Sequence, residues 1–187
     1  KQIEKNIKKN KNSENFELYK KIIEFKPLNV NEYYKELGTM YEQKFMFIEA
    51  IECYKNILKT EKQNLSIIGV LTNQIGVCYF NIKDFKSAIE QFKKVLQIKE
   101  IADVYCNIGQ CNIGQHDYKE AEINLLKSFY MDKNVKACSS LGQIYYYTKQ
   151  YNKSIDFYSY CSEVNEFLLY NLSFSYLSKK EFKTGFQ

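Results

Sequence analysis

The sequence predicts an all-α protein, built as an array of antiparallel helix pairs. A bulky residue followed by a small one recurs along the chain, from Leu37-Gly38 to Leu172-Ser173, at spacings of 31 to 38 residues. A second small residue stands twelve positions after each first one. Where two helices cross closely, a side chain larger than a methyl group forces them apart. The paired small residues therefore predict the points at which the helices of each pair cross.

Aromatic residues at fixed positions complete five repeated units. The bulky–small pairs are Leu37-Gly38, Ile75-Gly76, Ile108-Gly109, Leu141-Gly142 and Leu172-Ser173, and the later small residues are Ala50, Ala88, Ala121, Ser154 and Gly185. The second helix of each unit opens on Phe47, Phe85, Tyr118, Tyr151 and Phe182, and a later anchor follows at Tyr54, Phe92, Leu125 and Tyr158. A single hairpin cannot bury its apolar face alone, so we expect neighbouring units to stack into a continuous core.

The segments before the array have a different character. Residues 1–12 are a basic lead-in with five lysines and one glutamate, which we expect to be solvated. Residues 13–27 predict a flanking helix, because Ser13 can cap a first turn and Pro27, the only proline, ends it. The array spans residues 31–187, with about four complete repeats and a truncated fifth. Because the fifth unit stops early in its second helix, we expect a piece of a longer protein.

The composition argues against several classes of function. Most of the net charge of +5 lies in residues 1–12, and the chain has no arginine, so we expect no nucleic-acid partner. No apolar stretch approaches the ~20 residues of a spanning helix, so we expect no membrane insertion. The six cysteines form no CxxC pair and His116 is the only histidine. We therefore expect reduced cysteines, no metal site, no cofactor and a cytoplasmic protein.

These repeats resemble the tetratricopeptide repeat family. The resemblance is carried by the large–Gly–x–x–Tyr pattern, as in Ile75-Gly76-Val77-Cys78-Tyr79, and by the later alanine, as in Ala88, in units of ~34 residues. It covers residues 31–187. The family's tryptophan position holds Tyr34 and Thr72, and no unit ends in proline, which affects the helix boundaries rather than the fold. The resemblance implies a right-handed superhelical solenoid in which the first helix of each unit lines a concave groove.

The groove implied by this resemblance supplies the candidate site. Its middle is rich in amides and its C-terminal end in tyrosine. Amide groups both donate and accept hydrogen bonds, which suits the backbone of an extended peptide. The candidate residues are Lys35, Asn73, Gln74, Asn107, Gln110, Gln143, Tyr146, Tyr147, Tyr170 and Asn171. An asparagine-rich chain also places amides on ordinary solvated helix faces, and this second interpretation stays open here.

The sequence contains no GxGxxG, GxxxxGK[ST], HExxH or GxSxG motif, and His116 falls in a predicted turn. We therefore expect a non-catalytic protein–protein interaction module or scaffold that binds a peptide segment or a partner subunit in its concave groove. The alternative is the substrate-recruiting N-terminal region of a larger enzyme, such as a glycosyltransferase whose catalytic domain lies beyond Gln187. Residues 176–186 are similar to the last repeat of some proteins of that kind. A third interpretation is a scaffold subunit of a large assembly, such as ciliary transport or cell-cycle machinery.

Overall fold

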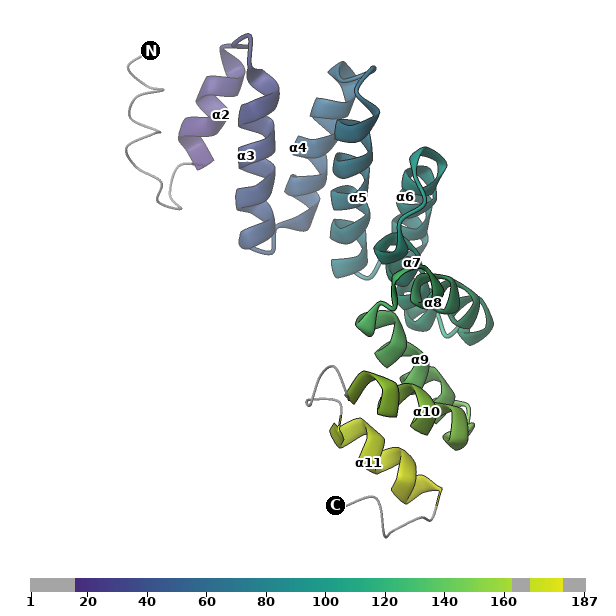
Figure 1. The fold of residues 1–187 in the computed structure, drawn as a ribbon. Coiled ribbons are helices and arrows are strands. Elements are labelled where there is room, and N and C mark those ends of the chain that lie inside the picture. Colours follow the sequence, from purple (N-terminus) through teal and green to yellow (C-terminus); the bar gives the residue numbers. More distant parts are fainter. Residues whose placement is uncertain (1–15, 163–168, 180–187) are drawn as a thin grey trace. The chain divides into compact units, whose positions relative to one another are not determined.

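The computed structural model describes residues 16–162 and 169–179, and every regular element in this part of the chain is a helix (Figure 1). The helices are α2 (Phe16–Glu24), α3 (Val30–Gln43), α4 (Phe47–Thr60), α5 (Leu65–Asn81), α6 (Phe85–Ile98), α7 (Ala102–Gly114), α8 (Tyr118–Asp132), α9 (Val135–Tyr147), α10 (Tyr151–Ser162) and α11 (Leu169–Ser178). They pack as sequential antiparallel pairs, which confirms the predicted all-α repeat. The basic lead-in, Ser13, Phe182 and Gly185 lie outside the described residues.

The chain divides into two units, residues 1–84 and 85–187. In the first unit, α2 packs on α3, α3 on α4 and α4 on α5. In the second, each helix from α6 to α11 packs on the next, and α7 also contacts α9. The pairs α3–α4, α7–α8 and α9–α10 each lie within one unit. The boundary falls in the turn between α5 and α6, a position that the sequence repeat does not distinguish from the other turns.

Three glycines of the repeat, Gly38, Gly109 and Gly142, lie where the two helices of a pair approach closely. A methyl group added at Gly109 would stand 2.5 Å from Cγ of Leu125 and 3.3 Å from the backbone oxygen of Ala121. In the next pair, Ser154 Oγ donates a hydrogen bond of 2.8 Å to the backbone oxygen of Gly142. In both helix pairs, the predicted contact between the two small residues of one repeat is thus confirmed. The anchor residue sixteen positions after the glycine fills the rest of the space.

Each of the two compact units, residues 1–84 and 85–187, has its own hydrophobic core. In the first, the anchor Tyr54 is fully buried together with Ala50, and Leu37 and Ile75 pack into the same cluster. In the second, the cluster contains the corresponding Leu125, Ala121 and Leu141, which are also fully buried. The positions predicted from the repeat to be small or bulky are therefore those that the packing buries.

The turns within the helix pairs share one backbone conformation. A residue with positive φ stands two positions before the second helix: Phe45, Lys83, His116 and Lys149, with φ of 60°, 63°, 61° and 59°. The backbone N–H that follows it donates to the carbonyl five residues earlier, for example Gln150 to Tyr145 at 2.8 Å. This bond satisfies a carbonyl at the end of the first helix. His116 lies exposed in such a turn, as expected, and the Asp117 side chain caps α8 by accepting from the Glu120 N–H at 3.2 Å.

The expectation that the cysteines are reduced holds at four positions and is wrong at one. Cys53, Cys78, Cys106 and Cys111 are free and buried, whereas Cys138 is disulfide-bonded. Spacing along the sequence does not reveal which sulfur atoms meet in the fold, so the sequence carried no signal for this bond. Among the described residues, no cluster of side chains could hold a metal ion. No helix in that part of the chain is both long and apolar enough to cross a membrane.

Candidate functional site

One face of α9 carries three of the candidate residues. Gln143, Tyr146 and Tyr147 stand at the i, i+3 and i+4 spacing that places side chains on the same side of a helix. Ser139 extends this face by one turn toward the start of α9. On α11, Asn171 and Phe174 share a face for the same reason. Each helix thus presents a short stripe in which amide or hydroxyl groups stand beside aromatic rings.

The two stripes line a single groove of about 290 Å³. We call it the aromatic groove; its lining residues in the described part of the chain are Ser139, Gln143, Tyr146, Tyr147, Tyr158, Asn171 and Phe174. Tyr158 of α10 is only 4% exposed and forms the floor, whereas Tyr147 and Phe174, 56% and 41% exposed, form the rim. Burial raises the pKa of Tyr158 to about 12. None of these seven described side chains is of a type that is charged at neutral pH.

The floor of the groove depends on a repeat glycine. A methyl group added at Gly142 would stand 2.8 Å from Cε1 of Tyr158. The absence of a side chain at Gly142 therefore makes room for the Tyr158 ring between α9 and α10. Sequence reasoning assigned Tyr158 only to the core, since its position in the repeat marks an anchor. The structure shows that the same ring packs against Gly142 and also lines the groove.

The polar groups of the groove differ in whether they already have a hydrogen-bond partner. Tyr146 accepts a hydrogen bond from Ser178 at 3.2 Å, which fixes its hydroxyl. Gln143 donates to the Tyr147 hydroxyl over 3.4 Å, which is longer than an ordinary N–H···O hydrogen bond. The Asn171 side chain has no hydrogen-bond partner among the described residues. Gln143 and Asn171 are therefore the amides that can bond to a ligand at least cost.

The remaining candidate residues lie on other helices or outside the lining of this groove. Tyr170 is exposed on α11, and its ring packs edge-on against Phe174 with a centroid distance of 4.7 Å. Asn107 and Gln110 are half-buried on α7 of the second unit, and Asn73 and Gln74 are half-buried on α5 of the first. Of the ten candidates, Gln143, Tyr146, Tyr147 and Asn171 thus meet in one groove, and Tyr170 borders it.

Asn73 and Gln74 differ from the amides of the groove. Their side-chain oxygens are buried and accept no hydrogen bond within the part of the chain that the structure describes. A buried acceptor without a donor costs roughly 1–3 kcal/mol. Because a ligand cannot reach a buried atom, either amide would offer its oxygen to a partner only after its side chain rotates.

Lys35 lines a second hollow, of about 320 Å³, that lies between α3, α4 and α5 of the first unit. We call it the apolar pocket; its described lining residues are Asn31, Glu32, Lys35, Ile57, Glu61, Ser66, Ile67, Val70 and Leu71. Sequence reasoning placed Lys35 on a groove but missed the exposed Ile67 and Val70. The signal was present in the run from Leu65 to Leu71, which is apolar around most of the helix instead of along one face.

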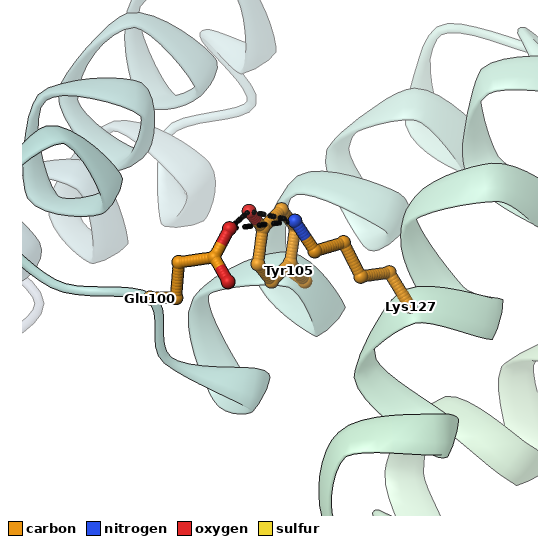
Figure 2. A network of polar contacts seen from close by, with 3 residues as sticks. All are labelled: Glu100, Tyr105 and Lys127. Atoms are coloured by element: carbon orange, nitrogen blue, oxygen red, sulfur yellow. Dashed lines mark hydrogen bonds and ion pairs between the residues drawn. The ribbon is translucent and has the colours of Figure 1, made fainter.

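Figure 2 shows a polar network that joins α7 to α8 and to the loop before α7. Lys127 Nζ lies 2.7 Å from Glu100 Oε1 and 2.6 Å from the Tyr105 hydroxyl, which in turn donates to Glu100 at 2.9 Å. The Nζ also lies 4.2 Å from the centroid of the Tyr105 ring. Its bonds to Glu100 and Tyr105 raise the pKa of Lys127, so the amine stays protonated at neutral pH and cannot act as a general base. We assign this network a structural role, which is to hold α7 in place.

The buried cysteines do not supply a nucleophile either. Burial raises the pKa of Cys106 to about 11 and that of Cys111 to about 12. Both sulfurs are therefore thiols at neutral pH, whereas the thiolate is the reactive form. His116, which stands near Cys111 in sequence, is exposed in its turn and contacts the Tyr118 hydroxyl at 3.4 Å.

Comparisons with known proteins agree with this architecture. The chain is 29% identical over 148 residues to the BBSome complex member BBS4 of Bos taurus, and the match covers 76% of this chain and 27% of that protein. Among solved structures, BtubC from P. vanneervenii has a TM-score of 0.72 at 14% identity, covering 92% of this chain and 83% of that one. MamA from Desulfovibrio magneticus RS-1 has a TM-score of 0.71 at 20% identity, covering 83% and 88%. At these identities the two structures show the fold alone.

A family model covers the middle and later helices. Residues 73–101, 102–134 and 135–166 each match the model described as the tetratricopeptide repeat. The three segments begin within α5, at the start of α7 and at the start of α9, which is the period of the observed helix pairs. Together they account for half of the sequence, and the chain belongs to the tetratricopeptide repeat family.

Proposed function

We propose that this chain is a non-catalytic interaction module that binds a peptide segment, from a separate protein or from a partner subunit, in the aromatic groove. The observation that carries the proposal is the lining of the groove, in which aromatic rings surround amides with unused hydrogen-bonding capacity. Ligand sites are typically concave, with a mostly apolar or aromatic wall and a few polar groups that fix orientation. Stacked helical repeats are suited to this task because they offer extended surfaces.

The non-catalytic part of the proposal is supported by the side chains that chemistry would need. The buried thiols are protonated, Lys127 is engaged by Glu100 and Tyr105, and His116 is exposed on a turn. Covalent catalysis needs a nucleophile within reach of a base that is itself oriented by a third group. We found no such arrangement among the described residues.

The test selects peptide ligands without assuming their sequence. A displayed library of random nine-residue peptides is selected on the full chain, and the binding of the enriched peptides is then measured with Tyr147→Ala and Phe174→Ala. Truncating a well-packed aromatic anchor commonly costs about 2 kcal/mol or more, so we expect at least a tenfold loss of affinity. The control is Tyr130→Ala, which removes an exposed aromatic ring of α8 that is not part of the groove and is 69% exposed. Unchanged affinity in both groove variants, or a library that yields no binder, would refute the proposal.

A second candidate function is that of a structural subunit in a large assembly. It is supported by the relative named above, which is a member of a protein complex. Under this proposal the native protein co-purifies with fixed partners in stoichiometric amounts and sediments with them as one particle. Purification as a lone chain, with partners recovered only in trace amounts, would argue against it. The substrate-recruiting region of an enzyme stays a prediction, tested by sequencing beyond Gln187 for an α/β nucleotide-sugar domain.

A further inference from the structure

The chemistry of the aromatic groove restricts the kind of peptide that fits it. Its lining residues in the described part of the chain are four aromatic residues, two amides and one serine, and none of these seven is acidic or basic. Moving a charged group out of water without a partner of opposite charge is costly. A segment that enters this groove is therefore expected to be uncharged where it meets the wall, both in its side chains and in lacking a free terminal carboxylate.

The polar groups of the groove favour an extended segment over a helix. A helix satisfies its own backbone carbonyls, whereas the groove presents the amide donors of Gln143 and Asn171. This difference points to a strand-like or polyproline-type backbone whose carbonyls are free.

The exposed rings and free amides of the groove suit a segment in the polyproline II conformation. Tyr147 on α9 and Phe174 on α11 expose their rings at the rim, and Gln143 and Asn171 lie beside them with amide hydrogens to donate. A polyproline II backbone makes no internal hydrogen bonds, so its carbonyls need donors from a partner or from water. Its proline rings are rigid and apolar, and aromatic-lined grooves bind such segments at a low cost in entropy.

We propose that the aromatic groove recognises an uncharged, proline-containing segment of its partner in the polyproline II conformation. Proline rings lie against Tyr147 and Phe174, over the floor formed by Tyr158, while Gln143 and Asn171 donate to backbone carbonyls. This inference rests on the proposed function, because it specifies which peptides the groove takes.

The experiment uses the same random nine-residue library on the full chain and asks what the enriched peptides have in common. We expect proline to be enriched and Asp, Glu, Lys and Arg to be depleted relative to the starting library. For one enriched peptide, synthetic versions with each proline changed to alanine, or with one neutral residue changed to glutamate, should each bind at least tenfold more weakly. Fluorescence polarisation gives these affinities.

The same data separate this inference from the proposed function. Peptides that lack proline but lose affinity with Tyr147→Ala and Phe174→Ala would overturn the inference and leave the proposed function standing. Peptides that bind equally well to both variants would overturn both, because the groove would not be the site. Tyr130→Ala serves again as the control, and circular dichroism verifies that each variant keeps its helices. The rim rings are exposed, so we expect the fold to survive their truncation.

Discussion

Substituting Gly109 with alanine tests the central packing feature of the repeat. The added methyl group would lie 2.5 Å from Cγ of Leu125 and 2.8 Å from its Cδ2. Leu125 is fully buried, so it cannot swing into solvent to relieve the overlap. Overpacking of this kind costs about 1–3 kcal/mol, whereas replacing glycine by alanine inside a helix gains about 1 kcal/mol. We therefore expect Gly109→Ala to lower the free energy of unfolding by up to about 2 kcal/mol.

A double-mutant cycle isolates the overlap from the gain in helix propensity. Leu125→Ala alone should cost about 2–5 kcal/mol because it leaves a cavity. In that background the methyl group of Gly109→Ala has room, so the substitution should stabilise by about 1 kcal/mol. The expected coupling between the two positions is then about 1–3 kcal/mol.

The assay is urea unfolding followed by far-ultraviolet circular dichroism for all four proteins. Repeat proteins can lose cooperativity, so the comparison requires that the four transitions have the same slope with urea concentration. If Gly109→Ala stabilises the otherwise unmodified chain as much as it stabilises the Leu125→Ala variant, the close approach of α7 and α8 is not what makes glycine necessary. That result would refute the assignment of the crossing point.

Three further predictions concern other parts of the fold. Lys149→Gly should raise the free energy of unfolding, measured in urea, by about 0.5–1 kcal/mol. The reason is that φ is 59° at this position, and a left-handed conformation costs a non-glycine residue more than glycine loses in entropy. The control, Lys149→Ala, should bring no such gain. Bonds from Lys127 and Tyr105 lower the pKa of Glu100 below its usual value near 4.5, so its stabilising contribution is complete above that pH and is lost as the pH falls through the lowered pKa. The melting temperatures of the unsubstituted chain and Glu100→Gln should therefore differ most near neutral pH and converge in acid, and a constant difference would contradict the assigned network. Burial raises the pKa of Cys106 to about 11, so thiol-specific labelling at neutral pH should be slow until urea unfolds the chain, and rapid labelling of native Cys106 would show that it is accessible.

The fold could be predicted because one packing requirement recurs in the sequence. A close crossing of two helices excludes side chains, so it selects small residues, and their spacing reveals both the length and the number of the units. Gly142 and Ser154 illustrate the point, since they were identified by spacing alone and are joined by a hydrogen bond in the structure. The division of the chain between α5 and α6 could not be predicted in this way. It depends on how strongly neighbouring helices pack, which the spacing of small residues does not encode.

The candidate site could be predicted only in part, for a related reason. Helical spacing shows which side chains of α9 share a face, so Gln143, Tyr146 and Tyr147 could be grouped from the sequence. It does not show how deep the surface between two helices is. The floor residue Tyr158 was missed because a tyrosine at an anchor position is read as core. Ile67 of the apolar pocket was missed because an apolar run without a period gives no face to follow.

Tyr158 also shows why the tests of binding use rim residues. Its ring packs against Gly142, so its truncation would leave a cavity between α9 and α10 and would change stability and binding together. Tyr147 and Phe174 contribute exposed surface to the same groove and can be truncated without opening the core. In an array where each repeat contacts only its neighbours, the floor of a groove is fixed by the packing of its own repeat, while the rim can change independently. We therefore expect the rim residues to determine which ligand binds. The contact between Gly142 and Tyr158 determines whether the groove forms at all.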